Sequence, residues 1–397
     1  MIYATTLMTS LAVIGAGITL VTLQTSDRQL RANLLDVQKA HWTAHAGLEW
    51  VLMYADQNDN WRTGLDGVSS TFDPRGEGGV VTVSVTDGDG NLGNDDRDTA
   101  FIQAAAILDD LNYTIEIAAQ SRAHQSFAYG LFATSSIYLC NSRIDAAIYA
   151  GTRVWDLCSA VTTTSQTVVN GPSGTSVSAS IFSFASAVDP IAPPNPDPNF
   201  YLGRATVITP TSNSEDTAYL TDVVLSTTRN SRGAVNGEGV YLIDAGASVL
   251  ELHHVALRGT LIITGNGGNR IRFRGPVRAT PGRPEYPTLV ILVPNTHIDF
   301  EMPGTLVEST RGVDFNEDGD TSDTLTQAIT GVVYAPGADV DLENTPWTFD
   351  GVMIADVIEV KAGVTVTHDD RYTDQLMPGF TDKKLYPVPG TAKVIMP

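Results

Sequence analysis

The N-terminal part of the chain carries two successive apolar patterns, and both indicate helix. Residues 1–26 contain no charged residue and are mostly apolar. From Asp27 onward, apolar residues such as Leu30, Leu34 and Val37 recur at spacings of three to five among polar residues, which is the period of a helix with one buried face. No proline interrupts this stretch. We predict one continuous helix over residues 2–55, roughly 80 Å long at 1.5 Å per residue.

The rest of the chain shows the signals of β-strands. Short β-branched runs, for example residues 240–246 and 288–294, are cut by Gly, Asn, Asp and Pro. A weak repeat places Gly331 and Gly351 20 residues apart in similar surroundings. This spacing favours the rungs of a β-solenoid, and a β-sandwich is the alternative because its turns recur every 8–12 residues. The fold class is therefore predicted as α+β.

Four regions follow from these patterns. Residues 189–201 carry five prolines and interrupt the strands, as expected of a stiff connector or surface strap. The predicted regions are an assembly helix at 1–55, a first β-rich region at 56–188, the connector at 189–201 and a second, solenoid-like region at 202–397.

Charge and cysteine content restrict the function classes. The chain has 24 Lys+Arg against 45 Asp+Glu, a formal net charge of -21, so we exclude nucleic acid as a partner. The only cysteines are Cys140 and Cys158. They predict one disulfide in an oxidising compartment, and two buried free thiols are the alternative.

The uncharged start of the chain predicts contact with lipid or with copies of itself. About 20 mostly apolar residues suffice for a helix to cross a bilayer, so residues 1–26 are expected to act as a retained membrane anchor or assembly helix. The candidate assembly residues are Met1, Thr5, Leu7, Leu11, Val13, Ile14, Gly15, Gly17, Ile18 and Leu20.

One acidic loop has oxygen ligands at the spacing of calcium-binding loops. Acidic or amide side chains stand at positions 1, 3 and 5, with Gly319 at position 6 for the sharp turn. Leu325 replaces the bidentate glutamate at position 12, so later acids of the loop are expected to complete the shell. A merely acidic turn is the alternative. The candidate Ca²⁺ ligands are Asp314, Asn316, Asp318, Asp320 and Asp323.

A second acidic run offers a weaker candidate for calcium. It lacks glycine at the sixth position, and a solvated loop is the favoured interpretation. Its candidate ligands are Asp87, Asp89, Asn91, Asp95 and Asp98. Elsewhere, Arg270, Arg272 and Arg274 alternate along one strand and predict a basic row that faces either solvent or an acidic partner.

The N-terminal third resembles type IV pilins and pilin-like subunits. The resemblance rests on the uncharged initial helix, the segment AHWTAHAGLEWVL at residues 40–52 and the exit NDNWRTG at residues 58–64. It implies a prepilin peptidase and pilus assembly machinery as partners, residence in the inner membrane before assembly, and then an extracellular filament with the helices in its core. Thr5 stands where most major pilins have glutamate, which weakens the case for a major subunit, since some minor subunits also lack this acid.

The function predicted from these features is that of a non-enzymatic structural subunit, because no nucleophile elbow, P-loop or paired-carboxylate motif occurs. It would form a homo-oligomeric helical filament with the β body exposed and available for cell adhesion. Two alternatives remain: a minor pilin or pseudopilin of a pilus or secretion system, and a membrane-anchored β-solenoid that binds or cleaves polysaccharide.

Overall fold

A computed structural model gives the fold of the chain. It describes residues 2–74, 76, 79–108, 111–163, 168–177, 184–196, 198–212, 216–246, 249–343 and 345–395, with side chains from residue 14 onward except those of 184–186. The chain divides into two compact units, residues 1–121 with 383–397, and residues 122–382. This grouping differs from the four predicted regions, because the C-terminal residues belong to the first unit and the proline-rich connector lies within the second.

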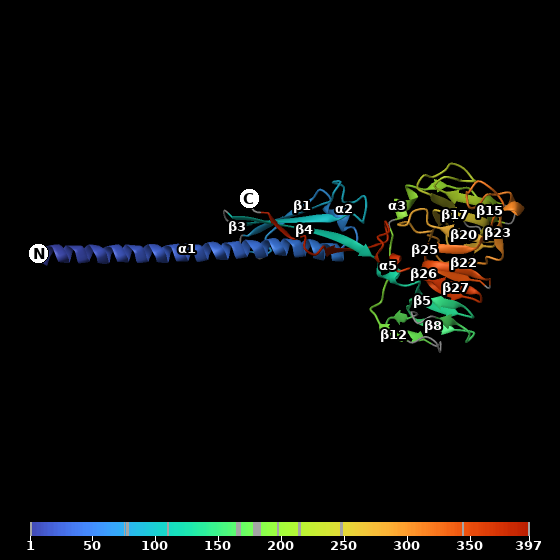
Figure 1. The fold of residues 1–397 in the computed structure, drawn as a ribbon, viewed down its shortest axis with the longest axis horizontal. Helices are drawn as coiled ribbons and strands as arrows, with labels where there is room; N and C mark the ends of the chain where they lie inside the picture. Colours follow the sequence, from blue (N-terminus) through green and yellow to red (C-terminus); the bar gives the residue numbers. More distant parts are fainter. Residues whose placement is uncertain are drawn as a thin grey trace. The chain divides into compact units, whose positions relative to one another are not determined.

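The first unit joins the N-terminal helix to an antiparallel sheet (Figure 1). Its elements are α1 (Ile2–Gln57), α2 (Trp61–Leu65), β1 (Ser69–Phe72), β2 (Val80–Thr86), β3 (Ala100–Leu108), β4 (Leu111–Ala123), β28 (Thr381–Pro387) and β29 (Lys393–Ile395). Strands β1 to β4 pair in sequence order, and β29 returns to pair with β4. The predicted long helix is confirmed.

The C-terminal half of α1 is held against this sheet by small residues. Ala40 and Ala44 are fully buried, as are the side chains of Leu48 and Val51. A Cβ added at Gly47 would lie 2.7 Å from a methyl group of Val81, closer than real Cβ contacts. The Ala-rich segment quoted for the pilin resemblance therefore lets the helix approach the sheet closely.

The second unit is a stack of short strands (Figure 1). Its strands are β5 (Leu131–Leu139), β6 (Arg143–Asp145), β7 (Ile148–Ala150), β8 (Arg153–Asp156), β9 (Thr162–Thr163), β10 (Val169–Gly171), β11 (Ser176–Val177), β12 (Phe184–Ala187), β13 (Thr206–Val207), β14 (Thr211–Ser212), β15 (Thr217–Ser226), β16 (Val240–Asp244), β17 (Val249–Arg258), β18 (Thr260–Thr264), β19 (Arg270–Phe273), β20 (Val277–Thr280), β21 (Leu289–Ile291), β22 (Thr296–Phe300), β23 (Thr305–Val307), β24 (Thr324–Thr326), β25 (Ala328–Leu342), β26 (Trp347–Val360) and β27 (Val364–Thr367). Its short helices are η1 (Gln125–Ala128), α3 (Pro198–Leu202), α4 (Glu308–Arg311) and α5 (Arg371–Asp374).

Parallel pairing dominates this stack. Strands β16 and β18 pair in parallel, as do β25 and β26, and Gly331 lies opposite Gly351 as the repeat predicts. The inward-facing aliphatic and aromatic residues of successive strands form one continuous core. Parallel pairing of successive strands is an arrangement that β-solenoids have, and the solenoid stays a prediction. We refer to the strands stacked in this way as rungs.

The rungs are not stacked in chain order. Strand β5, the first of this unit, pairs in parallel with β26, one of the last. The rungs from β5 to β12 therefore extend away from β26 on one side, and those from β25 back to β13 extend on the other. The connector at 189–201 must travel from one part of the stack to the other.

Tyrosines of the rungs fasten this connector. The hydroxyl of Tyr149 accepts the Ile191 N–H at 2.9 Å, and the hydroxyl of Tyr334 donates to the carbonyl of Pro194 at 2.5 Å. Both tyrosines are buried, and Ile191 and Phe200 of the connector pack against the same apolar cluster of the stack. The connector is therefore hydrogen-bonded to the stack at two points.

Candidate functional site

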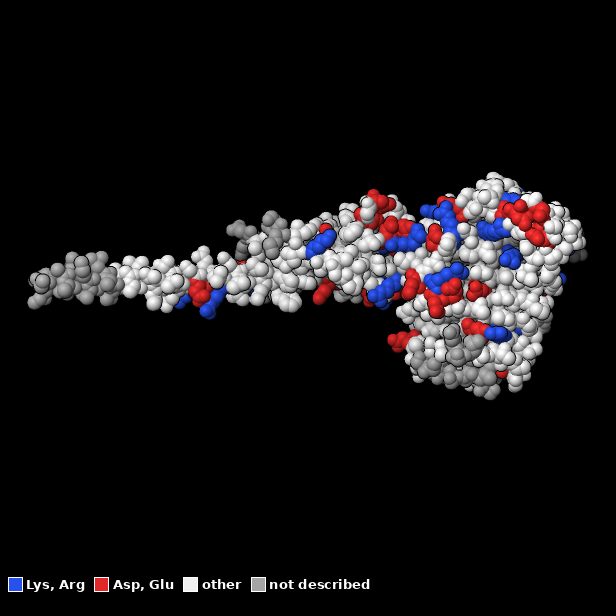
Figure 2. All heavy atoms as spheres, viewed as in Figure 1, with Lys and Arg blue, Asp and Glu red and all other residues white. Residues whose placement is uncertain are grey.

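The N-terminal half of α1 exposes an apolar surface over its described residues. The large apolar side chains between residues 14 and 37 are 41–65% exposed; they are Ile14, Ile18, Leu20, Val21, Leu23, Leu30, Leu34, Leu35 and Val37. In the face seen in Figure 2, uncharged residues make up most of this part of α1. Within the stretch, Arg31 forms an ion pair with Asp27 one turn away at 3.0 Å. We refer to this set of apolar residues as the helix surface.

Several of the residues predicted for assembly lie on this helix. Gly15 and Gly17 have no described atom of another part of the chain within 4 Å of an added Cβ, so none of the described residues packs against them in the single chain. The side chains of Met1, Thr5, Leu7, Leu11 and Val13 lie outside the described residues. No described helix contains a stretch that is both long and apolar enough to span a bilayer.

Three threonines between these apolar residues hydrogen-bond to the backbone of α1 itself. The hydroxyls of Thr19, Thr22 and Thr25 donate to the carbonyl oxygens four residues earlier at 2.5–2.8 Å. A hydroxyl bonded in this way carries a smaller desolvation cost when it is removed from water. These three threonines are therefore compatible with an apolar environment.

The first acidic loop is organised by a residue that the sequence analysis missed. Glu308, fully buried at the start of α4, accepts the N–H groups of Phe315 and Asn316 at 2.6 and 3.1 Å with one oxygen, and that of Asp323 at 3.3 Å with the other. Carboxylate oxygens of Glu308, Asp320 and Asp323 lie within 4.8 Å of one another. Glu308 lies six residues before the motif, outside the ligand spacing of a calcium-binding loop. Its role therefore became visible only in the folded structure.

The other predicted ligands of this loop make local hydrogen bonds. Asp314 accepts the N–H groups of Glu317 and Gly319, while the side-chain amide of Asn316 donates to Asp318 and Asp323. Hydrogen bonding with Asp318 is the main cause that raises the pKa of Asp323. This crowding of carboxylates is the setting in which a cation would bind, and calcium here stays a prediction.

The second acidic loop brings together part of its predicted ligand set. Carboxylate oxygens of Asp87, Asp89 and Asp98 lie within 4.8 Å of one another. Asp95 instead forms an ion pair with Arg97 at 2.6 Å. The main-chain N–H of Asn91 donates to Asp87 and Asp89, so that residue shapes the loop through its backbone.

The predicted disulfide is confirmed, and its position follows from the rungs. Cys140 and Cys158 are bonded, with Cα atoms 4.8 Å apart. They follow β5 and β8, which pair in parallel with Leu139 opposite Asp156. The bond therefore links the turns that follow two neighbouring parallel strands.

The arginine row is matched by acids on neighbouring rungs. Arg270 lies 2.6 Å from Asp299, and both Arg272 and Arg274 lie within 3.6 Å of Glu251. Burial raises the pKa of Asp299, but hydrogen bonds and charge from Arg270 outweigh this and hold the pKa below its usual range. The row is thus neutralised within the molecule, which removes much of its attraction for an acidic partner.

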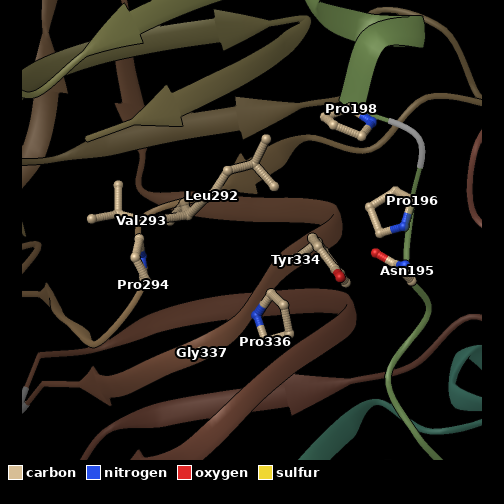
Figure 3. A pocket seen from close by; sticks show the side chains of 10 residues that line it. Asn195, Pro196, Pro198, Leu292, Val293, Pro294, Tyr334, Pro336 and Gly337 are labelled. Carbon is tan, nitrogen blue, oxygen red and sulfur yellow. The ribbon is translucent and has the colours of Figure 1, made fainter. Parts of the chain in front are cut away.

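A pocket of about 370 Å³ lies between the proline-rich connector and the rungs (Figure 3). Its lining is mostly apolar: Asn195, Pro196, Pro198, Ile291, Leu292, Val293, Pro294, Tyr334, Pro336 and Gly337. The hydroxyl of Tyr334 donates a hydrogen bond to the carbonyl of Pro194, and burial raises the pKa of Tyr334. None of these lining residues is a carboxylic acid, histidine or cysteine.

The geometry above combines an exposed apolar helix with a β-rich body. The chain is similar to a competence pilin. The competence-associated pilin ComZ from Thermus thermophilus matches over 91% of this chain and 98% of its own, at 13% sequence identity and a TM-score of 0.32. No protein-family model matches the chain, and neither does any curated protein. The pilin-like order predicted from the sequence, a long N-terminal helix followed by a β-rich body, is confirmed.

Proposed function

We propose that the chain is a structural, non-enzymatic subunit of a type IV pilus-like filament and polymerises through α1. The observation that supports this most directly is the helix surface, because large apolar side chains on a regular helix remain exposed beside a complete β core. Contiguous exposed apolar surfaces of this kind mark interaction sites.

Copies of the same helix are the occupant that fits this surface best. Each copy brings the same apolar side chains, internally bonded threonines and self-paired Asp27 and Arg31. Helices packed side by side therefore bury apolar area without leaving an unpaired charge from this pair. Gly15 and Gly17 allow close approach of a neighbouring helix.

The disulfide supports a location outside the cytoplasm. Disulfides persist in oxidising compartments, and the Cys140–Cys158 bond closes a corner of the body. We place the assembled filament at the cell surface and propose that lipid of the inner membrane holds the N-terminal helix before assembly. Pilus assembly machinery and a prepilin peptidase are the partners implied by the pilin resemblance.

Deletion of residues 1–26 tests the proposal. We expect the full chain to form filaments in negative-stain electron microscopy after detergent removal, and the deleted chain to stay monomeric in sedimentation velocity. A circular dichroism spectrum dominated by β-structure would verify that the deleted chain is folded. Filaments of the same diameter from the deleted chain would contradict assembly through this helix.

A further inference from the structure

The loop between β2 and β3 begins with a buried carboxylate. These strands form an antiparallel hairpin whose last pair is Thr86 with Phe101. Asp87, the next residue, is only 9% exposed. An ionised carboxylate in such a position requires partners for both oxygens.

Only one of the two oxygens of Asp87 has such partners. Its Oδ1 accepts the N–H groups of Gly90 and Asn91 at 2.7 and 3.0 Å, which closes the turn. Its Oδ2 is buried and receives no hydrogen bond from any residue that the structure describes. The turn therefore accounts for one oxygen and leaves the second without a role.

Two further carboxylates lie beside Asp87. One oxygen from each of Asp87, Asp89 and Asp98 lies within 4.8 Å of the other two. Three carboxylates at this separation repel one another unless a positive charge lies between them.

The basic side chains near this group, Arg62 and Arg97, bind other atoms of the loop. Arg62 is itself 9% exposed, and its guanidinium donates to the main-chain carbonyls of Leu92, Asp96 and Asp98 at 2.7–3.4 Å. The positive charge of Arg62 interacts favourably with the aspartates of the loop. Its N–H groups, however, donate to main-chain carbonyls of the loop and not to the carboxylates. Within the described residues, Asp87, Asp89 and Asp98 take part in no ion pair.

We propose that Asp87, Asp89 and Asp98 bind a calcium ion, with the unpartnered Oδ2 of Asp87 as a ligand. The donors are all carboxylate oxygens, which suit calcium, magnesium or manganese better than zinc or copper. Ca²⁺–oxygen distances of about 2.3–2.6 Å allow two ligands of one ion to lie up to roughly 5 Å apart. Carboxylate oxygens within 4.8 Å of one another can therefore share a calcium ion, with water completing its irregular shell, whereas Mg²⁺ demands a near-ideal octahedron. Arg62 then fixes the loop backbone around the ion.

Isothermal titration of the full chain with Ca²⁺ in detergent micelles, after removal of metal, tests this site. Asp87→Asn and Asp98→Asn keep side-chain size and each should weaken one binding event by roughly tenfold or more, because calcium affinity follows the number of charged ligands. Asp244→Asn is the matched control, since Asp244, like Asp87, accepts a main-chain N–H in a turn and lies outside the group. Its titration should equal that of the unaltered chain.

Asp98→Asn keeps the test decisive if Asp87→Asn fails to fold, because Asp98 is only partly buried. Asp323→Asn assigns any second binding event to the other acidic loop. An unchanged isotherm for Asp98→Asn, or no binding at millimolar Ca²⁺, would overturn the proposal. The titration requires no filament, so its failure and the failure of the proposed assembly are distinguishable.

Discussion

Leu23 offers a quantitative test of the helix surface. Its side chain is 65% exposed in the single chain, the most exposed of the large apolar side chains that the structure describes on α1. If neighbouring helices cover this position in a filament, replacing leucine by serine removes most of the apolar area that assembly buries there. The substitution leaves the β core untouched, because Leu23 lies ahead of the buried part of α1.

The size of the effect follows from that exposure. Complete burial of a leucine side chain stabilises by about 1.5–3 kcal/mol. Since 65% of the side chain remains to be buried, assembly gains about 1–2 kcal/mol at this position. A free energy of 1.4 kcal/mol corresponds to a tenfold change in an equilibrium constant, so Leu23→Ser should raise the critical concentration for polymerisation about 5- to 30-fold.

Sedimentation of polymer after detergent removal measures that critical concentration. Leu157→Ser is the matched control, because Leu157 is a leucine of the second unit with 54% exposure and the account gives it no part in assembly. We expect its critical concentration to equal that of the unaltered chain. Equal values for Leu23→Ser and the unaltered chain, or a larger shift for Leu157→Ser, would refute the reasoning.

Three further predictions concern the second unit. Replacing Cys140 and Cys158 by serine should cost about 3 kcal/mol of unfolding free energy through the lost loop constraint, and an unchanged calorimetric midpoint would contradict this. Gly351→Ala should cost roughly 1–3 kcal/mol, because its φ is 155° and an added Cβ would lie 2.0 Å from the carbonyl oxygen of Gly331; Gly237→Ala, with open space around it, should be nearly neutral in the same denaturant titration. If the loop of Asp314 to Asp323 binds calcium, chelation should lower the melting temperature of an Asp87→Asn chain. Asp320→Asn added to that chain should abolish the difference, and persistence of the difference would count against this loop.

The sequence predicted the elements whose signals are local. The continuous helix follows from apolar spacing and the absence of proline, and its length needed no knowledge of tertiary contacts. The disulfide was also predictable, because the chain has no third cysteine that could bond with either Cys140 or Cys158. The 20-residue repeat gave the correct register of Gly331 with Gly351, since that pair belongs to consecutive rungs.

The order of the rungs was not predictable from such local signals. The pairing of β5 with β26 joins residues far apart in the chain. Strands of similar apolar composition can pair in parallel with one another in many orders, so composition alone does not specify the partner of each strand. The proline content indicated a strap, but its path became clear only from the hydrogen bonds of Tyr149 and Tyr334.

The candidate sites show the same division. Sequence spacing found the acidic loops but could not identify Glu308, which reaches the first loop from α4. It also could not separate Asp95, which pairs with Arg97, from Asp98, which joins the carboxylate group. The arginine row was visible in the sequence, whereas the acids that neutralise it lie on other rungs.

Helical reconstruction by electron cryomicroscopy of the assembled full chain tests the central claim most directly. We predict a filament whose core contains α1 from many copies, with Ile18, Leu20 and Leu23 covered by neighbouring helices and the β-rich unit on the outside. A filament held together by contacts between β-rich units, with the residues of the helix surface open to solvent, would contradict the account.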